Sequence, residues 1–508
     1  MPNRKSGDLR RVRPSSRLID MSIMIETELK LDLDGLSVSD ARTLLMSRYG
    51  LPLDERRLVS TYFDTDDRRL WQAGVTLRIR EDGSRRLQTL KVERSGGNGL
   101  FKRPEIEREV HDDIPLLDAS MLTLGGGLLG ADIVGAPLRA QFTTDINRQR
   151  WRILEGNAEL ELVFDQGAIL GGGLQSAVRE LEIELKSGCV AGLFDLAKAL
   201  SLRLPVRVGF QSKAERGYDL TNPVSAGAVK AQGLAITDAL TAAETLQTMG
   251  RACLRHYRLN EANLLQRPDA ETLHQCRVAL RRFKSGLSVF KPLIDDPESH
   301  AIIKRLKAAI RLFGEARNLD VLIQGTEDSD LAARLEARRR PLYDAVRSRL
   351  IAETSRDLLL DLIIWLENGY WSWKPDTAEA RRQPIKPFAT LRLRHCRRRL
   401  KRRGAHLSHL DAADRHAVRI SAKTLRYATE VFAPLFDSAE ARGEIGASLM
   451  TLERLQTALG ELTDRESGVA LLKQINEPGE TSFPGRRKTT KAAVRAYKAV
   501  FAQRPAWA

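Results

Sequence analysis

The sequence has few of the features that mark membrane, secreted or zinc-binding proteins. Its longest apolar stretch, Leu358–Leu366, is interrupted by Asp361 and is far shorter than the run of about 20 residues that a membrane-spanning helix needs. The first twenty residues carry six Lys and Arg but no apolar run, so they do not form a secretory signal. The four cysteines show no CxxC pair and no zinc-ligand spacing, which favours buried thiols in a reducing cytoplasm. We therefore expect a cytoplasmic protein without a membrane-spanning helix.

Length and charge divide the chain into two parts. At 508 residues it is too long for a single core, and its 42% hydrophobic and 29% charged residues are typical of folded domains. Residues 1–220 contain 33 Lys and Arg against 33 Asp and Glu, whereas residues 221–508 contain 49 against 33. The net charge of +16 thus belongs to the second part. This asymmetry predicts a neutral domain followed by one that binds a polyanion: nucleic acid, an anionic membrane or polyphosphate.

Charged and apolar residues alternate in seven segments between Ile25 and Leu220, a pattern that predicts β-strands. The charged face of a single strand is usually solvated. Because nearly every position of this parity is charged in all seven segments, we predict that the apolar faces pack outward and the charged faces line a closed antiparallel barrel. The positions are Glu26, Glu28 and Lys30; Arg78 and Arg80; Thr89, Lys91 and Glu93; Arg103, Glu105 and Glu107; Arg148, Arg150 and Arg152; Glu159, Glu161 and Asp165; Glu180, Glu182, Glu184 and Lys186.

A lumen that carries both signs of charge suits a metal-bound polyphosphate. Carboxylates two positions apart on a strand lie about 6.6 Å apart, and carboxylates from facing strands can converge on hard cations such as Mg²⁺ or Mn²⁺. Arg and Lys on other strands would hold a compact oxyanion, Arg through pairs of parallel hydrogen bonds. Each basic residue could instead be a structural partner of a lumen carboxylate.

The segment Glu26-Thr-Glu28-Leu-Lys30 resembles the ExExK signature of the CYTH superfamily, the triphosphate tunnel metalloenzymes. The resemblance covers about 195 residues and continues, in the family's order, through Tyr62–Thr65, Leu77–Arg80, Leu90–Lys91, Arg103–Glu105, Arg148–Trp151, Asp165–Gly167, Glu180–Leu185 and Ser212–Tyr218. It implies an eight-stranded antiparallel tunnel in which a metal-activated water, and no protein nucleophile, attacks a triphosphate. The implied metal ligands are Glu26, Glu28, Glu182, Glu184 and Asp165, assisted by Glu161. The implied substrate-binding residues are Lys30, Arg78, Arg80, Lys91, Arg103, Arg148 and Lys213.

One segment departs from the family pattern. Relatives often have Arg before the second Thr of Phe142-Thr-Thr144, so one phosphate contact is expected to be missing here. That departure puts substrate length or affinity in doubt, not the fold. The glycine runs Gly125–Gly127 and Gly171–Gly173 have no phosphate-loop spacing and predict surface turns.

The second part is predicted to be helical and internally repeated. His274, Arg277, Arg281, Lys284 and Phe290 match His416, Arg419, Lys423, Arg426 and Phe432, each pair 142 positions apart. The spacing i, i+3, i+7, i+10 places the His and three basic residues on one helix face. One such face would usually be a solvated surface, but its repetition predicts two anion-binding faces. A third cluster, from Arg392 to Arg403, has eight basic residues, and we expect the three to converge on one groove.

These histidine-bearing repeats resemble those of the CHAD domain, over roughly Thr237–Leu472. The resemblance implies two pseudo-symmetric helical bundles whose basic groove binds inorganic polyphosphate through His274, Arg277, Arg281, Lys284, His416, Arg419, Lys423 and Arg426. Asn318 stands where the family more often has Asp. The predicted fold class is α+β: an eight-stranded antiparallel β tunnel followed by an all-α double bundle. The predicted divisions are a disordered basic leader at 1–22, the tunnel at 23–220, a linker at 221–236, the helical domain at 237–475 and a basic tail at 476–508, with Met21 or Met24 as the start.

The favoured function is hydrolysis of inorganic triphosphate to diphosphate and phosphate with Mg²⁺ or Mn²⁺. The helical half would bind long polyphosphate and could recruit the protein to polyphosphate granules or regulate the tunnel. Two alternatives stay open: a polyphosphate-binding protein with a weakly active tunnel, and cyclisation of ATP, for which no base pocket is evident. Nucleic-acid binding is disfavoured because aromatic residues make up only 6% of the chain and form no stacking pattern.

Overall fold

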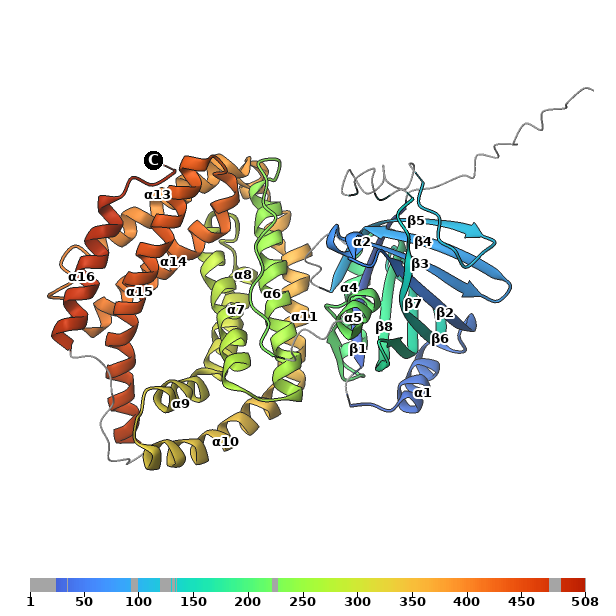
Figure 1. Ribbon diagram of the computed structural model, residues 1–508, viewed down its shortest axis with the longest axis horizontal. Coiled ribbons are helices and arrows are strands. Elements are labelled where there is room, and N and C mark those ends of the chain that lie inside the picture. Colours follow the sequence, from blue (N-terminus) through green and yellow to red (C-terminus); the bar gives the residue numbers. More distant parts are fainter. Residues whose placement is uncertain are drawn as a thin grey trace, which may run out of the picture.

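The computed structural model describes residues 24–33, 35–92, 99–118, 129, 133, 135–221, 227–474 and 486–507. A β-barrel, coloured blue to green, and a set of helices, coloured yellow-green to red, lie side by side along the long axis of the molecule (Figure 1). The predicted order, an antiparallel tunnel followed by a helical region, is confirmed. The predicted leader, Glu93 and Gly125–Gly127 lie outside the described residues.

Eight antiparallel strands form the barrel. Their order is β5-β4-β3-β2-β6-β7-β8-β1, and β1 pairs back with β5, which closes the ring. The short strand β9 (Val206–Val208) pairs with the end of β1. The eight strands are β1 (Met24–Leu33), β2 (Asp54–Asp64), β3 (Val75–Asp82), β4 (Arg85–Val92), β5 (Leu100–Val110), β6 (Arg139–Glu155), β7 (Ala158–Gly171) and β8 (Leu174–Ser187).

The apolar faces of the strands are covered from outside, as the alternation predicts. Leu29 and Ile183 pack with α1 (Val38–Tyr49) and α4 (Val190–Ser201) in a core that continues into the helical half. A second core covers β3 and β4 with α2 (Arg69–Gln72). Burying the apolar positions in this way leaves the other face of each strand to the lumen.

Helix α5 (Lys213–Thr221) packs on β6, β7 and β8, and its first two residues line the lumen. Its Tyr218 is buried with Phe142 of β6. A Cβ atom at Gly217 would come within 2.2 Å of the Phe142 ring. Glycine at this position therefore lets α5 lie close to the barrel, which fixes the place of Lys213.

The second half contains helices joined by short connections. They are α6 (Ala242–Gln266), α7 (Ala270–Val289), α8 (Pro297–Leu312), α9 (Gly314–Gln324), α10 (Ser329–Ile351), α11 (Glu353–Asn368), α12 (Ala378–Arg382), α13 (Ile385–Arg403), α14 (Ala412–Phe432), α15 (Ala439–Gln474) and α16 (Arg486–Ala502). Asp269 and Asp411, also 142 positions apart, accept hydrogen bonds from the first backbone N–H groups of α7 and α14. The repeat therefore includes the helix starts as well as the basic residues.

The C-terminal segment, predicted only as a basic tail, contains a packed helix. Helix α16 packs along α15, with Ala493 fully buried and Trp507 only 3% exposed. The guanidinium group of Arg397 in α13 donates to the carbonyl of Val500, 3.2 Å away. The basic residues of this segment lie on the outer side of an amphipathic helix. Because they are spread along the segment, its apolar side was not recognised in the sequence.

The predicted linker is partly packed. Residues 222–226 lie outside the described part, but residues 227–236 run along α6. The backbone N–H of Val229 donates to Oδ1 of Asn260, and its carbonyl accepts from Nδ2 of the same residue, both at 2.9 Å. These hydrogen bonds fix the segment against the helical half.

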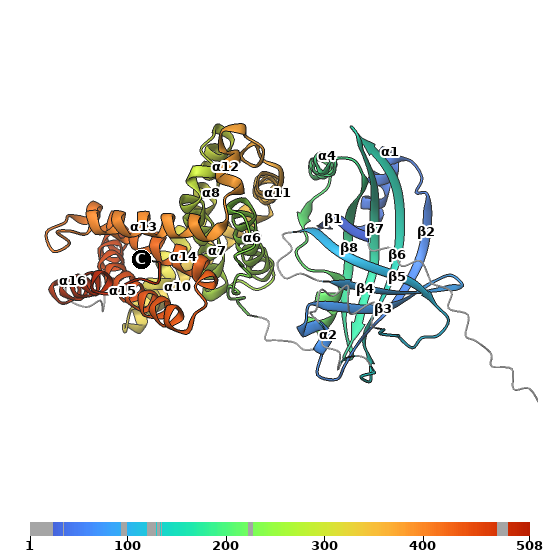
Figure 2. The ribbon, with the colours of Figure 1, turned by 90° about the horizontal axis from the view of Figure 1, so that it is seen from above.

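The two halves meet at α6 and α11, the helices that lie beside the barrel in both views (Figures 1 and 2). Helix α11 packs on α4 and β9. Within the described residues, no helix combines the length and the apolar character needed to cross a membrane.

Candidate functional site in the barrel lumen

The charged faces of the strands enclose a cavity of about 360 Å³, to which every strand of the barrel contributes. All twelve residues predicted to bind metal or substrate in the tunnel line it: Glu26, Glu28, Lys30, Arg78, Arg80, Lys91, Arg103, Arg148, Asp165, Glu182, Glu184 and Lys213. Arg152 and Glu159 share the alternation but are not part of its wall, and they pair with each other at 2.5 Å. The alternation therefore located the lumen, and the roles of the single residues remain predictions.

Six side chains, here called the inner cluster, form connected ion pairs: Lys30, Arg148, Lys213, Asp165, Glu180 and Glu182. The ammonium of Lys213 lies 2.6 Å from Asp165 and 3.0 Å from Glu182. Arg148 donates to both oxygens of Asp165, at 2.7 and 2.5 Å. The strand register explains the contact between Arg148 and Asp165, because Arg148 of β6 lies directly opposite Asp165 of β7.

The cations of the inner cluster keep two of its acids, Asp165 and Glu182, ionised. Burial alone would raise the pKa of Glu182, but the surrounding cations, Lys213 most strongly, outweigh burial and hold that pKa well below its usual value. Burial would also raise the pKa of Asp165, but Arg148 and Lys213 outweigh burial and lower this pKa. Oxygens of Asp165, Glu180 and Glu182 lie within 4.8 Å of one another, a spacing that a metal ion could also bridge. Asp165 is fully buried and its charge is matched by Arg148, so its position suits orientation of that guanidinium group.

A second group of acids lies one row along the same strands. The register places Glu28 of β1 opposite Glu184 of β8, and Glu184 opposite Glu161 of β7. Directly opposite side chains have Cβ atoms about 4.5–5.5 Å apart. On the other side of β1, Glu28 contacts Arg103. The result is a row of three acids across three neighbouring strands.

Neighbouring acids repel the charge of Glu184, as acids do in metal sites. The pKa of Glu184 is raised, mainly by burial and further by Glu26 and Glu161, although Lys186 at 2.7 Å opposes the shift. Glu26 is paired with Lys91 at 2.7 Å. Glutamate oxygens are the ligands that Mg²⁺ and Mn²⁺ prefer, and a bound cation relieves such repulsion. The donor set therefore fits a hard divalent cation.

Arg78 and Arg80 of β3 differ from the other basic residues of the lumen. Among the described residues, neither has an ion-pair partner: Arg78 donates to the hydroxyl of Tyr62 at 3.4 Å, and Arg80 to that of Ser60 at 3.3 Å. Burial lowers the pKa of Arg80 to about 10, and the nearby Arg78 adds to the effect. Buried guanidinium groups that repel one another are stabilised by an anion between them.

Strand β2 contributes Tyr62, which belongs to a segment of the family resemblance, and three side chains that the sequence did not single out: Asp54, Arg56 and Ser60. Asp54 pairs with Arg150 of β6, whose Nε lies 2.8 Å away. These residues do alternate, but Leu58 and two hydroxyl residues interrupt the charged pattern. Only the pairing of β2 with β3 and β6 shows that this face points into the lumen.

In the helical half, the two predicted basic faces lie on α7 and α14, which pack against each other. They comprise His274, Arg277, Arg281 and Lys284 on α7 and His416, Arg419, Lys423 and Arg426 on α14. Burial is the main cause that lowers the pKa of Arg277 to about 10. Arg281, Arg317 and Arg419 add to this effect, although Arg317 belongs to α9 and Arg419 to α14. The repeated cations thus lie close enough to repel one another.

The two repeated histidines are shifted toward the neutral form. Burial and then Arg317 lower the pKa of His274, and burial and then Arg419 lower that of His416. At neutral pH they therefore contribute little positive charge. Nδ1 of His274 is buried without a hydrogen-bond partner among the described atoms.

The third basic cluster, on α13, has another use for several of its cations. Arg392 donates to the carbonyl of Val289 at 2.8 Å, and Arg394 to that of Trp507 at 3.3 Å. Arg403 donates to the hydroxyl of Ser421 at 3.1 Å. Several cations of this cluster are thus hydrogen-bonded to oxygen acceptors of neighbouring segments.

Comparisons with known proteins divide the chain at the same place. The profile of the CYTH domain matches residues 24–218, and that of the CHAD domain matches residues 248–473. An inorganic triphosphatase of Haemophilus influenzae is 34% identical over 164 residues, which are 32% of this chain and 45% of the relative. The chain therefore spans less than half the length of that relative.

Two solved structures are also similar. The CHAD domain of the plant Ricinus communis has 26% identity and a TM-score of 0.44, covering 54% of this chain and 91% of its own. A putative adenylyl cyclase from Hippeastrum, described as having a dominant triphosphatase activity, has 22% identity and a TM-score of 0.28, covering 37% and 91%.

Proposed function

The chain joins a CYTH domain, residues 24–218, to a CHAD domain, residues 248–473, and on that premise we propose that it is a metal-dependent inorganic triphosphatase with a polyphosphate-binding helical half. The observation that carries the proposal is the division of charge in the lumen. Lys30, Arg148 and Lys213 form ion pairs with buried acids, whereas Arg78 and Arg80 form none among the described residues. A lumen so arranged has cations for a phosphate chain and acids for a metal ion.

The residues divide into three roles. Glu26, Glu28, Glu182 and Glu184 would hold Mg²⁺ or Mn²⁺, which when bound neutralises phosphate oxygens and activates water. Arg78 and Arg80 would bind oxygens of the triphosphate, each with several N–H donors in a fixed plane.

Lys30, Arg148 and Lys213 would hold the inner acids in place and keep Asp165 and Glu182 ionised, and their remaining N–H groups could reach the substrate. Hydrolysis by water needs no protein nucleophile, which agrees with the lining of the cavity by ion pairs. Lys91 and Arg103 complete the proposed substrate contacts and are at the same time partners of Glu26 and Glu28.

The proposed polyphosphate site is the pair of basic faces on α7 and α14. Its support is the mutual repulsion of Arg277, Arg281 and Arg419, which a chain of phosphates would relieve. Such binding would bring a cytoplasmic protein to polyphosphate granules or present long chains near the tunnel.

The test is phosphate release from tripolyphosphate, ATP and thiamine triphosphate, each with Mg²⁺ and with Mn²⁺. We expect tripolyphosphate to be the best substrate, and Glu28→Gln to lower kcat/KM at least a hundredfold, about 2.7 kcal/mol of transition-state stabilisation. Glu159→Gln is the matched control, because Glu159 is also a strand glutamate paired with an arginine but lies outside the cavity. Absence of hydrolysis by the wild type, or equal activity of the two variants, would contradict the proposal. Formation of cyclic AMP from ATP would favour a cyclase instead.

A further inference from the structure

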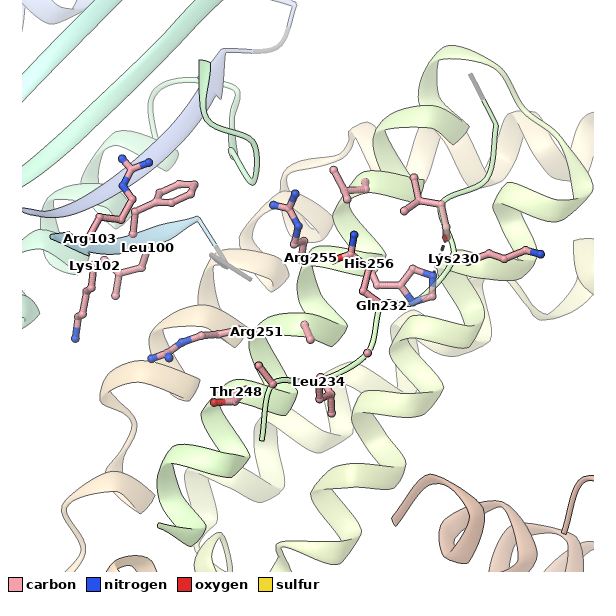
Figure 3. A pocket seen from close by; sticks show the side chains of 16 residues that line it. Leu100, Lys102, Arg103, Lys230, Gln232, Leu234, Thr248, Arg251, Arg255 and His256 are labelled. Carbon is pink, nitrogen blue, oxygen red and sulfur yellow. Dashed lines mark hydrogen bonds between the residues drawn. The ribbon is translucent and has the colours of Figure 1, made fainter. Parts of the chain in front are cut away.

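Two arginines of the helical half reach into the barrel half. Arg255 of α6 contacts the carboxylate of Glu215 in α5 and donates to the carbonyl of Phe210. One turn later, Nη2 of Arg258 lies 3.2 Å from the carboxylate of Asp32 in β1, and its Nε donates to the carbonyl of Val208 at 3.1 Å. In Figure 3, Arg251 and Arg255 of α6 and Leu100, Lys102 and Arg103 of β5 lie on opposite sides of a cavity of about 320 Å³ beside this contact.

The contacted segments are those that carry the two lysines of the inner cluster. Glu215 lies in the first turn of α5, two residues after Lys213. Asp32 lies two residues after Lys30 on β1. The two segments are also bonded to each other. Gly209 lies between β9 and α5, and its N–H donates to the carbonyl of Lys30 at 2.9 Å.

A further ion pair holds α6 against β9. Glu261, one turn after Arg258, lies 3.5 Å from Arg207 of β9 and accepts from the hydroxyl of Tyr257 at 3.0 Å. Both Arg207 and Glu261 are almost completely buried, with side chains 3% and 2% exposed. Arg207 also donates to the carbonyl of Leu350 at 2.8 Å. A buried network of this kind fixes the position of its members, since leaving any one unpaired costs free energy.

We propose that Arg255 and Arg258 of the helical half are positioning residues for the tunnel: they fix Lys213 and Lys30 against Glu180 and Glu182. Both lysines contact these same two glutamates from different segments. A displacement of α5 by a fraction of the 2.6 Å between Lys213 and Asp165 would therefore alter the inner cluster. The helical half is then a structural part of the proposed active site as well as a polyanion-binding unit. This inference rests on the proposed triphosphatase activity of the lumen.

Another contact between the halves provides a matched control. Lys198 of α4 pairs with Asp361 of α11 at 2.8 Å. It joins the same two halves but contacts neither α5 nor β1 through its side chain in the described structure. Lys198→Gln therefore removes an interdomain ion pair without removing a restraint on either lysine.

The test compares Arg255→Gln, Glu215→Gln, the double variant and Lys198→Gln in the full-length protein. We expect each of the first two to lower kcat/KM for tripolyphosphate at least tenfold, with part of the loss in KM, because Lys213 would contact substrate. The double variant should be no worse than the more damaged single variant, because both single variants already remove the same contact, that between Arg255 and Glu215. Arg255→Lys, which can still pair with Glu215, should recover part of the activity, and Lys198→Gln should stay within threefold of the wild type.

Hydrogen exchange of the amides in residues 208–221 gives a readout that does not depend on catalysis. We expect faster exchange in Arg255→Gln than in Lys198→Gln. Equal exchange and equal kinetics in these two variants, or additive losses in the double variant, would overturn the positioning role. If the wild type does not hydrolyse tripolyphosphate, the triphosphatase proposal fails by itself, and the exchange comparison still decides whether α6 restrains α5.

Discussion

Replacing Lys213 by methionine would remove the central cation of the inner cluster while keeping its length and its apolar stem. The ammonium lies near three acids at once: Asp165 at 2.6 Å, Glu182 at 3.0 Å, and Glu180. All three acids are buried. Removing one partner from a buried ion-pair group costs about 3–5 kcal/mol, because it leaves charge uncompensated. We expect Lys213→Met to lower the free energy of unfolding by this amount at pH 7.5.

The loss should depend on pH in a defined direction. In the wild type, the folded-state pKa values of Glu182 and Asp165 lie below their usual range, so these acids contribute stability that is present above the unfolded pKa and is lost as pH falls through the folded pKa. Without Lys213 both folded-state values rise, and the acids accept protons sooner. The difference in stability between the two proteins should therefore shrink as the pH falls toward about 4, the usual pKa of Asp and Glu.

A divalent cation should replace the missing ammonium. Oxygens of the three acids lie within 4.8 Å of one another, so the variant offers a site for Mn²⁺ that the wild type fills with Lys213. At a metal concentration 100 times its dissociation constant, binding adds about 2.7 kcal/mol, which would restore more than half of the upper estimate of the loss. We expect Mn²⁺ to stabilise Lys213→Met more than the wild type.

Urea unfolding at pH 7.5 and pH 4.5, with and without Mn²⁺, measures these effects. Lys198→Met is the control, because the Lys198–Asp361 pair is partly exposed, 35% and 21%, and such pairs contribute about 0–1 kcal/mol. The reasoning is refuted if Lys213→Met loses no more stability than Lys198→Met, or if its loss is the same at both pH values.

Three other predictions follow from particular residues. Because the pKa of Glu184 is raised, the acid limb of the pH profile of kcat/KM at limiting metal should lie above the usual pKa of glutamate. Lys186 lowers the pKa of Glu184, so Lys186→Gln should move this limb to higher pH. An unchanged profile would exclude Glu184 as the titrating group. Arg277→Gln with Arg419→Gln should weaken binding of long polyphosphate at least tenfold in calorimetry and reduce its salt dependence, whereas Lys386→Gln, which removes an exposed cation paired with Asp238, should not. Ala493→Glu should lower the free energy of unfolding by about 3 kcal/mol or more by burying a charge under α16, whereas Ala499→Glu on the exposed side should have little effect; equal melting temperatures would show that α16 does not pack in solution.

Much of the fold could be predicted from local patterns. Alternation of Glu26, Glu28 and Lys30 with apolar neighbours fixes which side chains share a strand face, whatever the rest of the chain does. The 142-residue repeat likewise predicted α7 and α14, and it could have predicted their starts, because Asp269 and Asp411 obey the same spacing. Helix α16 was not predicted because six basic residues are spread among its 17 positions, and because burial of its apolar side depends on what α15 presents to it.

The sequence by itself determined the parity of the strands, the repeat of the helical half and the separation of net charge between them, since each depends on neighbours along the chain. Only the tertiary structure decided which charges are compensated. Lys30 and Glu182 are 152 positions apart and meet through the β1–β8 register, whereas Arg78 and Arg80, which are also basic, form no ion pair among the described residues. Only the tertiary structure, too, brings Arg255 and Arg258 to the segments that carry Lys213 and Lys30. Pairing across strands and between domains is a property of register and packing, and no local pattern contains it.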